Sequence, residues 1–265
     1  MDSMILGSYV PLNSTFHKLD PRAKIMGMLF LIIAIFIPAG WVGYAILALV
    51  VADCLYLSKL NFRYVWKAMK PMLFMMVFLL IVNILVIKTG DLWTTIFGLQ
   101  IYSDAIHQTL YIVIRLLFMV TITTILTATT KPLDLTLGIE DLLIPFKKIG
   151  VPAHEIAMMI SIALRFIPTL IEETQRIMKA QASRGVDLEN GSFKEKIMSI
   201  LSLIVPLFIS AFQRAEELAY AMEARGYVPD QKRTRYKQLK MRFQDWYVLA
   251  FAIVILVIEI MVATL

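Results

Sequence analysis

The chain has 265 residues, of which 59% are hydrophobic, and its mean hydropathy is +0.73. This apolar share exceeds the roughly 45–50% typical of soluble domains, so we predict an integral membrane protein. The net charge of +6 does not indicate nucleic-acid binding, because Lys and Arg flank apolar segments and form no basic stripe with interleaved aromatics. Cys54 is the only cysteine, which excludes an intramolecular disulfide framework.

Apolar runs predict about five transmembrane helices. In chain order they are 23–38, 41–58, 70–88, 107–128 and 246–264. Pro38-Ala39-Gly40 separates the first two, and the acidic Asp2 is atypical of a secretory signal, so we expect the N-terminal segment to be retained. The predicted fold is an all-α membrane protein. Its predicted domains are four transmembrane helices in 1–130, a cytoplasmic helical domain in 131–245 and a final transmembrane helix in 246–265.

The distribution of positive charge predicts the orientation. With the N-terminus inside, all seventeen Lys and Arg residues of 131–245 are cytoplasmic, only Lys88 lies outside, and Arg115 lies within a span. The positive-inside rule describes such an asymmetry. We therefore expect the N-terminus and residues 131–245 to face the cytoplasm.

Two apolar runs inside the cytoplasmic segment could themselves be spans. Ile156 to Ile171 and Ile197 to Phe212 each fall short of roughly 20 residues, and the first contains Arg165. If both crossed, five positive charges between them would be exported, against the rule that the rest of the chain obeys. We favour cytoplasmic helices and keep membrane entry as the alternative.

These runs begin two long predicted helices. One covers about Ala153 to Arg184 with Pro168 inside it, and the other about Phe193 to Arg225 with Pro206 inside it. Proline removes a backbone donor and bends a helix, so both prolines are candidate hinges. In the second halves, apolar residues such as Leu218 and Met222 recur at helical spacing and predict a buried stripe.

Both helices end in Arg-Gly, at Arg184-Gly185 and at Arg225-Gly226. Such an end is also an ordinary helix terminator, because glycine adopts the left-handed conformation and arginine complements the helix dipole. Two of them on bent cytoplasmic helices favour a contact surface. We expect the apolar stripe to give affinity and the planar guanidinium fork to set the register.

Three segments carry a resemblance to a known family. SYVPLNSTFHKLDPRAKI (8–25) holds an HxLDPRxK pattern, and LDLTLGIEDLLIPFKKIGVP (133–152) is similar to a first cytoplasmic coupling helix. The third mark is the pair Ala182-Ser183-Arg184-Gly185 and Glu223-Ala224-Arg225-Gly226. Over nearly its whole length the chain resembles the transmembrane T component of energy-coupling factor (ECF) transporters, ABC-type importers of vitamins and transition-metal ions. Ser183 departs from an alanine in the pattern, and we expect the same close packing. The pattern in 8–25 comprises His17, Leu19, Asp20, Pro21, Arg22 and Lys24.

The resemblance implies a non-catalytic subunit in the cell membrane of a prokaryote, with about five transmembrane helices and, in 131–245, a large cytoplasmic insertion of three coupling helices, two of them long and bent at proline. Its partners would be two ABC ATPase subunits (A and A′), a membrane-embedded substrate-binding S component and the lipid bilayer. ATP and Mg²⁺ are expected on the ATPases, and this chain has no GxxxxGK[ST] phosphate loop of its own. The implied ATPase-docking residues are Ala182, Ser183, Arg184, Gly185, Ala224, Arg225 and Gly226.

Other polar residues carry weaker hypotheses. Asp53, Arg115 and Glu259 lie within predicted spans, where charges are costly. Asp53 and Arg115 are a candidate intramembrane pair, for which we favour a structural role over an ion path. The three histidines, His17, His107 and His154, are far apart in sequence, and we expect no metal site.

An autonomous secondary transporter or channel is the main alternative function. It would be favoured by broken spans at matching positions of two inverted halves, and the sequence shows none. A membrane-embedded enzyme would need titratable residues converging at one depth, whereas those present are scattered. The transported substrate is expected to be bound by another subunit.

Overall fold

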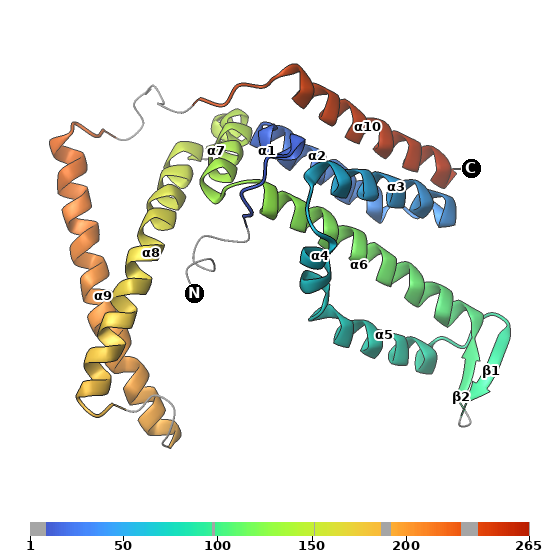
Figure 1. Ribbon diagram of the computed structural model, residues 1–265, viewed down its shortest axis with the longest axis horizontal. Coiled ribbons are helices and arrows are strands. Elements are labelled where there is room, and N and C mark those ends of the chain that lie inside the picture. Colours follow the sequence, from blue (N-terminus) through green and yellow to red (C-terminus); the bar gives the residue numbers. More distant parts are fainter. Residues whose placement is uncertain (1–8, 97–98, 151, 187–191, 229–237, 265) are drawn as a thin grey trace. The chain divides into compact units, whose positions relative to one another are not determined.

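The computed structural model describes residues 9–96, 99–150, 152–186, 192–228 and 238–264. These are almost entirely α-helical, as predicted, with one short β-hairpin (Figure 1). The chain divides into two compact units. One comprises Gly7–Leu142 with Leu239–Leu265, called here the membrane unit, and the other, called the rod unit, contains Leu143–Gln238.

Each predicted span of the membrane unit is a helix. They are α2 (Pro21–Phe36), α3 (Gly40–Ser58), α5 (Met72–Val86), α6 (Ser103–Thr129) and α10 (Phe243–Thr264). The predicted break between the first two spans is confirmed, since α3 begins at Gly40 with φ +66°. Buried side chains from four of these helices form the main core, among them Ile35, Leu47, Ile122 and Ile255.

Several short elements of this unit were not among the predicted spans. Helix α4 (Phe62–Met69) is bent by 53° against α5, and α1 (Thr15–Lys18) precedes α2. Strands β1 (Leu92–Ile96) and β2 (Leu99–Tyr102) pair in an antiparallel hairpin between α5 and α6. Helix α7 (Pro132–Leu143), in the segment similar to a first coupling helix, has all but its last residue in this unit.

The rod unit is built from two helices of more than 30 residues. In chain order, the 3-10 helix η1 (Ile144–Ile149) comes first, then α8 (Ala153–Ser183), and then α9 (Phe193–Ala224). Both bounds agree with the predicted helices to within one residue. Helix α9 starts at a capping box, in which Ser192 Oγ accepts from Glu195 N and Glu195 Oε2 accepts from Ser192 N at 2.7 Å.

Length and composition alone do not separate the rods from the spans. Within the described residues, α3, α6, α8, α9 and α10 are long and apolar enough to cross a membrane, and α4 with α5 could form a sixth, broken span. Helix α2, with 16 residues, is three residues shorter than α3, the shortest of these five. The placement of α8 and α9 on the cytoplasmic side therefore stays a prediction that rests on charge.

Candidate functional site

Helices α8 and α9 pack against each other in opposite directions and cross, as Figure 1 shows. Gln181 Nε2, near the end of α8, donates to the backbone oxygen of Ser202 in the first half of α9 at 3.1 Å. Further along, Arg214 Nη2 lies 3.6 Å from Glu173 Oε2. The carboxyl end of α8 thus lies beside the first half of α9, and the two rods form one body.

A cavity of about 320 Å³ lies between the rods. Its lining includes Ile162 and Phe166 from α8 and Leu218 and Met222 from α9. The stripe predicted in the second half of α9 therefore faces the first half of α8. Leu218 and Met222 are half-buried there, whereas other apolar side chains of α9, such as Ile204 and Phe208, are exposed.

The two Arg-Gly ends have the same backbone geometry. After α8, Gly185 N donates to Ala182 O at 3.0 Å and Val186 N donates to Gln181 O at 3.1 Å. After α9, Gly226 N donates to Glu223 O at 2.8 Å and Tyr227 N donates to Met222 O at 2.9 Å. Each pair of bonds is a Schellman motif, with the 5→2 and 6→1 pattern around a left-handed residue. The two ends are therefore similar in backbone structure as well as in sequence.

Backbone conformation explains the glycine in each end. The φ angles of Gly185 and Gly226 are +84° and +70°, a region that costs L-residues with a side chain roughly 1–2 kcal/mol. Among the described residues, a Cβ at either position would meet nothing within 4 Å, so close packing against them is not the reason. Close packing at Ser183 stays a prediction. The Ser183 hydroxyl itself donates to Lys179 O at 3.0 Å within α8.

The arginine of each end is the C-cap residue. Arg184 and Arg225 have nearly the same backbone angles, with φ −90° and −88°, and both side chains are exposed. Within the described ranges, neither guanidinium group has a hydrogen bond or an ion pair. Because the end of α8 lies beside Ser202, the two arginines are separated by about the length of α9 from Ser202 to Arg225. At 1.5 Å per residue this is roughly 35 Å.

The candidate hinges lie inside continuous helices. Pro168 is within α8 and Pro206 is within α9. Thr169 Oγ1, next to the first proline, donates to Phe166 O at 2.8 Å. The hinge role of either proline stays a prediction.

The HxLDPRxK pattern holds the start of α2 in the membrane unit. His17 Nε2 lies 2.8 Å from Val10 O and its Nδ1 lies 2.7 Å from Ser14 Oγ. Asp20 caps α2 by accepting from Arg22 N at 2.9 Å. Lys24 Nζ donates to Thr129 O and Thr130 Oγ1 at the end of α6. These residues therefore fasten α2 to its neighbours.

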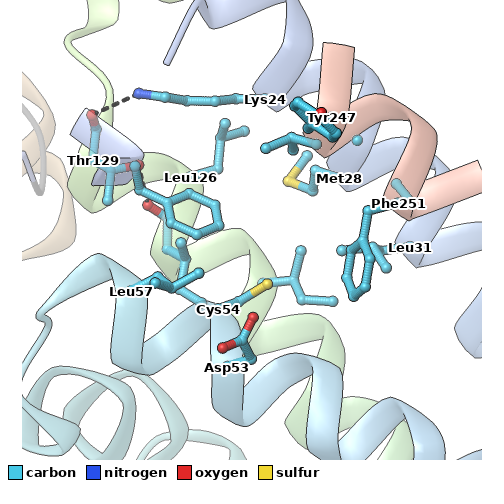
Figure 2. A pocket seen from close by; sticks show the side chains of 16 residues that line it. Lys24, Met28, Leu31, Asp53, Cys54, Leu57, Leu126, Thr129, Tyr247 and Phe251 are labelled. Carbon is cyan, nitrogen blue, oxygen red and sulfur yellow. Dashed lines mark hydrogen bonds between the residues drawn. The ribbon is translucent and has the colours of Figure 1, made fainter. Parts of the chain in front are cut away.

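The structure does not bring Asp53 and Arg115 together as an ion pair within the described chain. Arg115 Nε donates to Tyr44 Oη at 3.2 Å, and its guanidinium carbon lies 5.6 Å from the ring centre of Phe36. Asp53 instead lines a largely apolar cavity of about 350 Å³, with Lys24 at the opposite side (Figure 2). Both residues lie on predicted span helices, α3 and α6, but the proposed pairing between these two described residues is not found.

Glu259 and the histidines have other surroundings. Glu259 on α10 is 0% exposed, packs against Gly43 of α3, and neither of its carboxylate oxygens has a hydrogen-bond partner in the described structure. His17 belongs to α1, His107 stacks edge-on against Trp41 with ring centres 6.0 Å apart, and His154 lies in the first turn of α8. No group of three potential metal ligands occurs among the residues that the structure describes.

Comparisons with known proteins show which family this chain is similar to. The family described as cobalt transport protein (CbiQ) matches residues 13–236. A protein of Macrococcus caseolyticus is 45% identical over 247 residues, which cover 93% of this chain and 91% of that protein. A Bacillus subtilis protein is 43% identical, with 96% of both chains covered, and one from Ruminiclostridium cellulolyticum is 46% identical, with 94% of this chain and 93% of its own covered. All three are named energy-coupling factor transporter transmembrane protein EcfT.

Proposed function

The chain belongs to the family of energy-coupling factor transporter transmembrane proteins, and we propose that its two Arg-Gly ends connect it to two ATPase subunits. As a transmembrane energy-coupling component, it would pass ATP-driven motion to a substrate-binding S component in the same membrane. The imported substrate would be a vitamin or another micronutrient. ATP and Mg²⁺ would be bound by the ATPases.

The observation that supports this proposal is the duplication of one exposed, rigidly terminated end. The paired Schellman bonds fix the direction in which the chain leaves each helix, while Arg184 and Arg225 extend from the C-cap. A guanidinium group offers five donors in a planar fork that fits a carboxylate or backbone carbonyls. A hydrogen bond to such a charged group contributes roughly 1.5–3 kcal/mol, enough to set register at an interface.

The separation of the ends favours two binding sites. At roughly 35 Å the arginines are too far apart to enter a single pocket on a partner. The bonds between Gln181 and Ser202 and between Arg214 and Glu173 hold the rods as one body. If two ATPase subunits approach each other on binding ATP, ends held in this way would transmit the movement to both rods.

The experiment compares Arg184→Ala with Arg225→Ala, singly and together, in the full complex. The complex would be reconstituted in liposomes, with tritiated riboflavin, biotin and folate and cobalt(II) as uptake probes, and ATP hydrolysis recorded in the same vesicles. Arg176→Ala is the matched control, because Arg176 is 76% exposed on α8 and pairs only at 3.7 Å with Glu173. Exposed pairs of this kind contribute little.

We expect the double variant to lose ATPase subunits on purification or to hydrolyse ATP without uptake. Each lost arginine should weaken binding by about tenfold or more, from the magnitude of a charge-assisted bond. Normal uptake and normal co-purification in the double variant would contradict the proposal. Uptake of a probe by the isolated chain, without ATPases, would instead support an autonomous transporter or channel.

A further inference from the structure

A cluster of four charged residues surrounds the start of α2 in the membrane unit. It comprises Asp20, Arg22, Asp141 and Asp245, and is called here the anchor cluster. Asp245 is only 2% exposed, and its Oδ1 accepts from Asp20 N at 2.8 Å. Its Oδ2 accepts from the backbone of Arg242, just before α10. One buried carboxylate thus fixes the start of α10 to the start of α2.

Arg22 provides the second connection. Its Nε and Nη2 lie 3.1 Å from the two carboxylate oxygens of Asp20, in the bidentate arrangement that holds a guanidinium plane in one orientation. Nη1 lies 3.3 Å from Asp141 Oδ2 on α7. The side chains of Asp20 and Asp141 are 2% and 16% exposed, so the ion pairs that Arg22 makes with them are shielded from solvent far more than an ordinary surface ion pair.

Close packing accompanies the charges. A Cβ on Gly138 of α7 would lie 3.1 Å from Pro21 Cβ and 3.2 Å from Ile25 Cδ1. A larger residue there would require the neighbouring atoms of α2 to shift by a few tenths of an ångström, so glycine favours the close approach of α7 to the first turn of α2. The ion pair therefore sits beside a tight helix contact and does not act alone.

The position of the cluster in the chain gives it a mechanical meaning. The chain passes from the membrane unit to the rod unit after Leu142 and returns at Leu239. Asp141 lies two residues before Leu143, where the rod unit begins, and Arg242 lies three residues after Leu239, where the membrane unit resumes. Both connections to the rod unit are therefore fixed at the same point, the start of α2.

We infer that the anchor cluster is where force from the rods is transferred to the membrane helices, with Arg22 and Asp141 as positioning residues. The inference rests on the proposed function. A displacement of the chain at residue 143 is resisted by Arg22 and passed to α2, whereas without the pair α7 would yield locally. Since the pair adds to packing that is already present, its loss leaves the protein folded but less strictly coupled.

The test uses the reconstituted complex with the same uptake probes and reports uptake per ATP hydrolysed. Asp141→Asn keeps the shape of the side chain and removes its charge, and Asp141→Glu keeps the charge. Asp91→Asn, at an exposed position before β1, is the matched control. We expect Asp141→Asn to assemble normally and hydrolyse ATP, with uptake per ATP lowered by about fivefold, the lower range of an allosteric coupling factor. Asp141→Glu should recover most of the loss.

Two outcomes would overturn the inference. One is an unchanged ratio in Asp141→Asn, and the other is a loss of uptake that follows only the amount of assembled complex, as expected if the pair were merely structural. If Asp141→Asn reduces assembly, Arg22→Lys serves as the second variant, because it keeps the charge and removes the fork. Failure of the proposed function is separately visible, as the unmodified complex would then show no ATP-driven uptake of any probe.

Discussion

Replacing Gly226 by alanine tests whether backbone geometry at the end of α9 directs Arg225. The substitution leaves the arginine in place and introduces no collision with the part of the chain that the structure describes, where nothing lies within 4 Å of the added Cβ. The cost therefore comes from φ, which is +70° and disfavours alanine by roughly 1–2 kcal/mol. That energy lowers the population of the intact end about 5–30-fold if the Schellman bonds to Glu223 and Met222 open in response.

We expect uptake per ATP to decrease in the order unmodified, Gly226→Asn, Gly226→Ala, because asparagine tolerates the left-handed region better than alanine. The assay is the liposome assay described above, with co-purification of the ATPases as a second readout. Gly27→Ala is the control, since its Cβ would meet Val248 Cγ1 at an ordinary 3.7 Å. The reasoning is refuted if Gly226→Ala matches the unmodified protein while Arg225→Ala is defective, because the arginine would then act without a fixed chain direction.

Two further changes probe the membrane unit through thermal unfolding in detergent. Tyr44→Phe removes the oxygen that accepts a hydrogen bond from Arg115, and should lower the free energy of unfolding by about 1.5–3 kcal/mol. Exchanging Arg115 and Asp53 should leave the protein no more stable than changing Arg115 to Asp alone. A gain in stability on exchange would support the predicted ion pair. Gly43→Ala places a Cβ against the Glu259 carboxylate and should cost about 1–3 kcal/mol by overpacking, and an unchanged midpoint would mean that α3 and α10 have room to separate.

Sequence reasoning succeeded where local signals are strong. The bounds of α8 and α9 were predicted to within one residue, because long periodic runs end at glycines that must adopt positive φ. The same reasoning did not find α4, which is eight residues long and follows the end of α3 closely. Short amphipathic segments next to apolar ones have too little length for their period to be distinguished.

Interactions between distant residues were beyond such reasoning. Asp53 and Arg115 were proposed as partners because both are charged residues within predicted spans, but a place within a span does not determine the direction in which a side chain faces. Likewise, nothing local in the sequence pairs Arg22 with Asp141, since only packing of α7 on α2 brings them to 3.3 Å. The family motif marked Arg22 as notable without indicating what it contacts.

The two Schellman ends also bear on how partners could be told apart. Their backbone bonds match atom for atom, so a pair of related subunits would meet the same main-chain surface twice. What differs is the flanking side chains, with Ser183 and Val186 at one end and Ala224 and Tyr227 at the other. If two different ATPase subunits bind these ends as proposed, such side-chain differences are what would favour one of their two possible orders. On that proposal the chain would act as a nearly symmetric adaptor whose polarity comes from a few side chains.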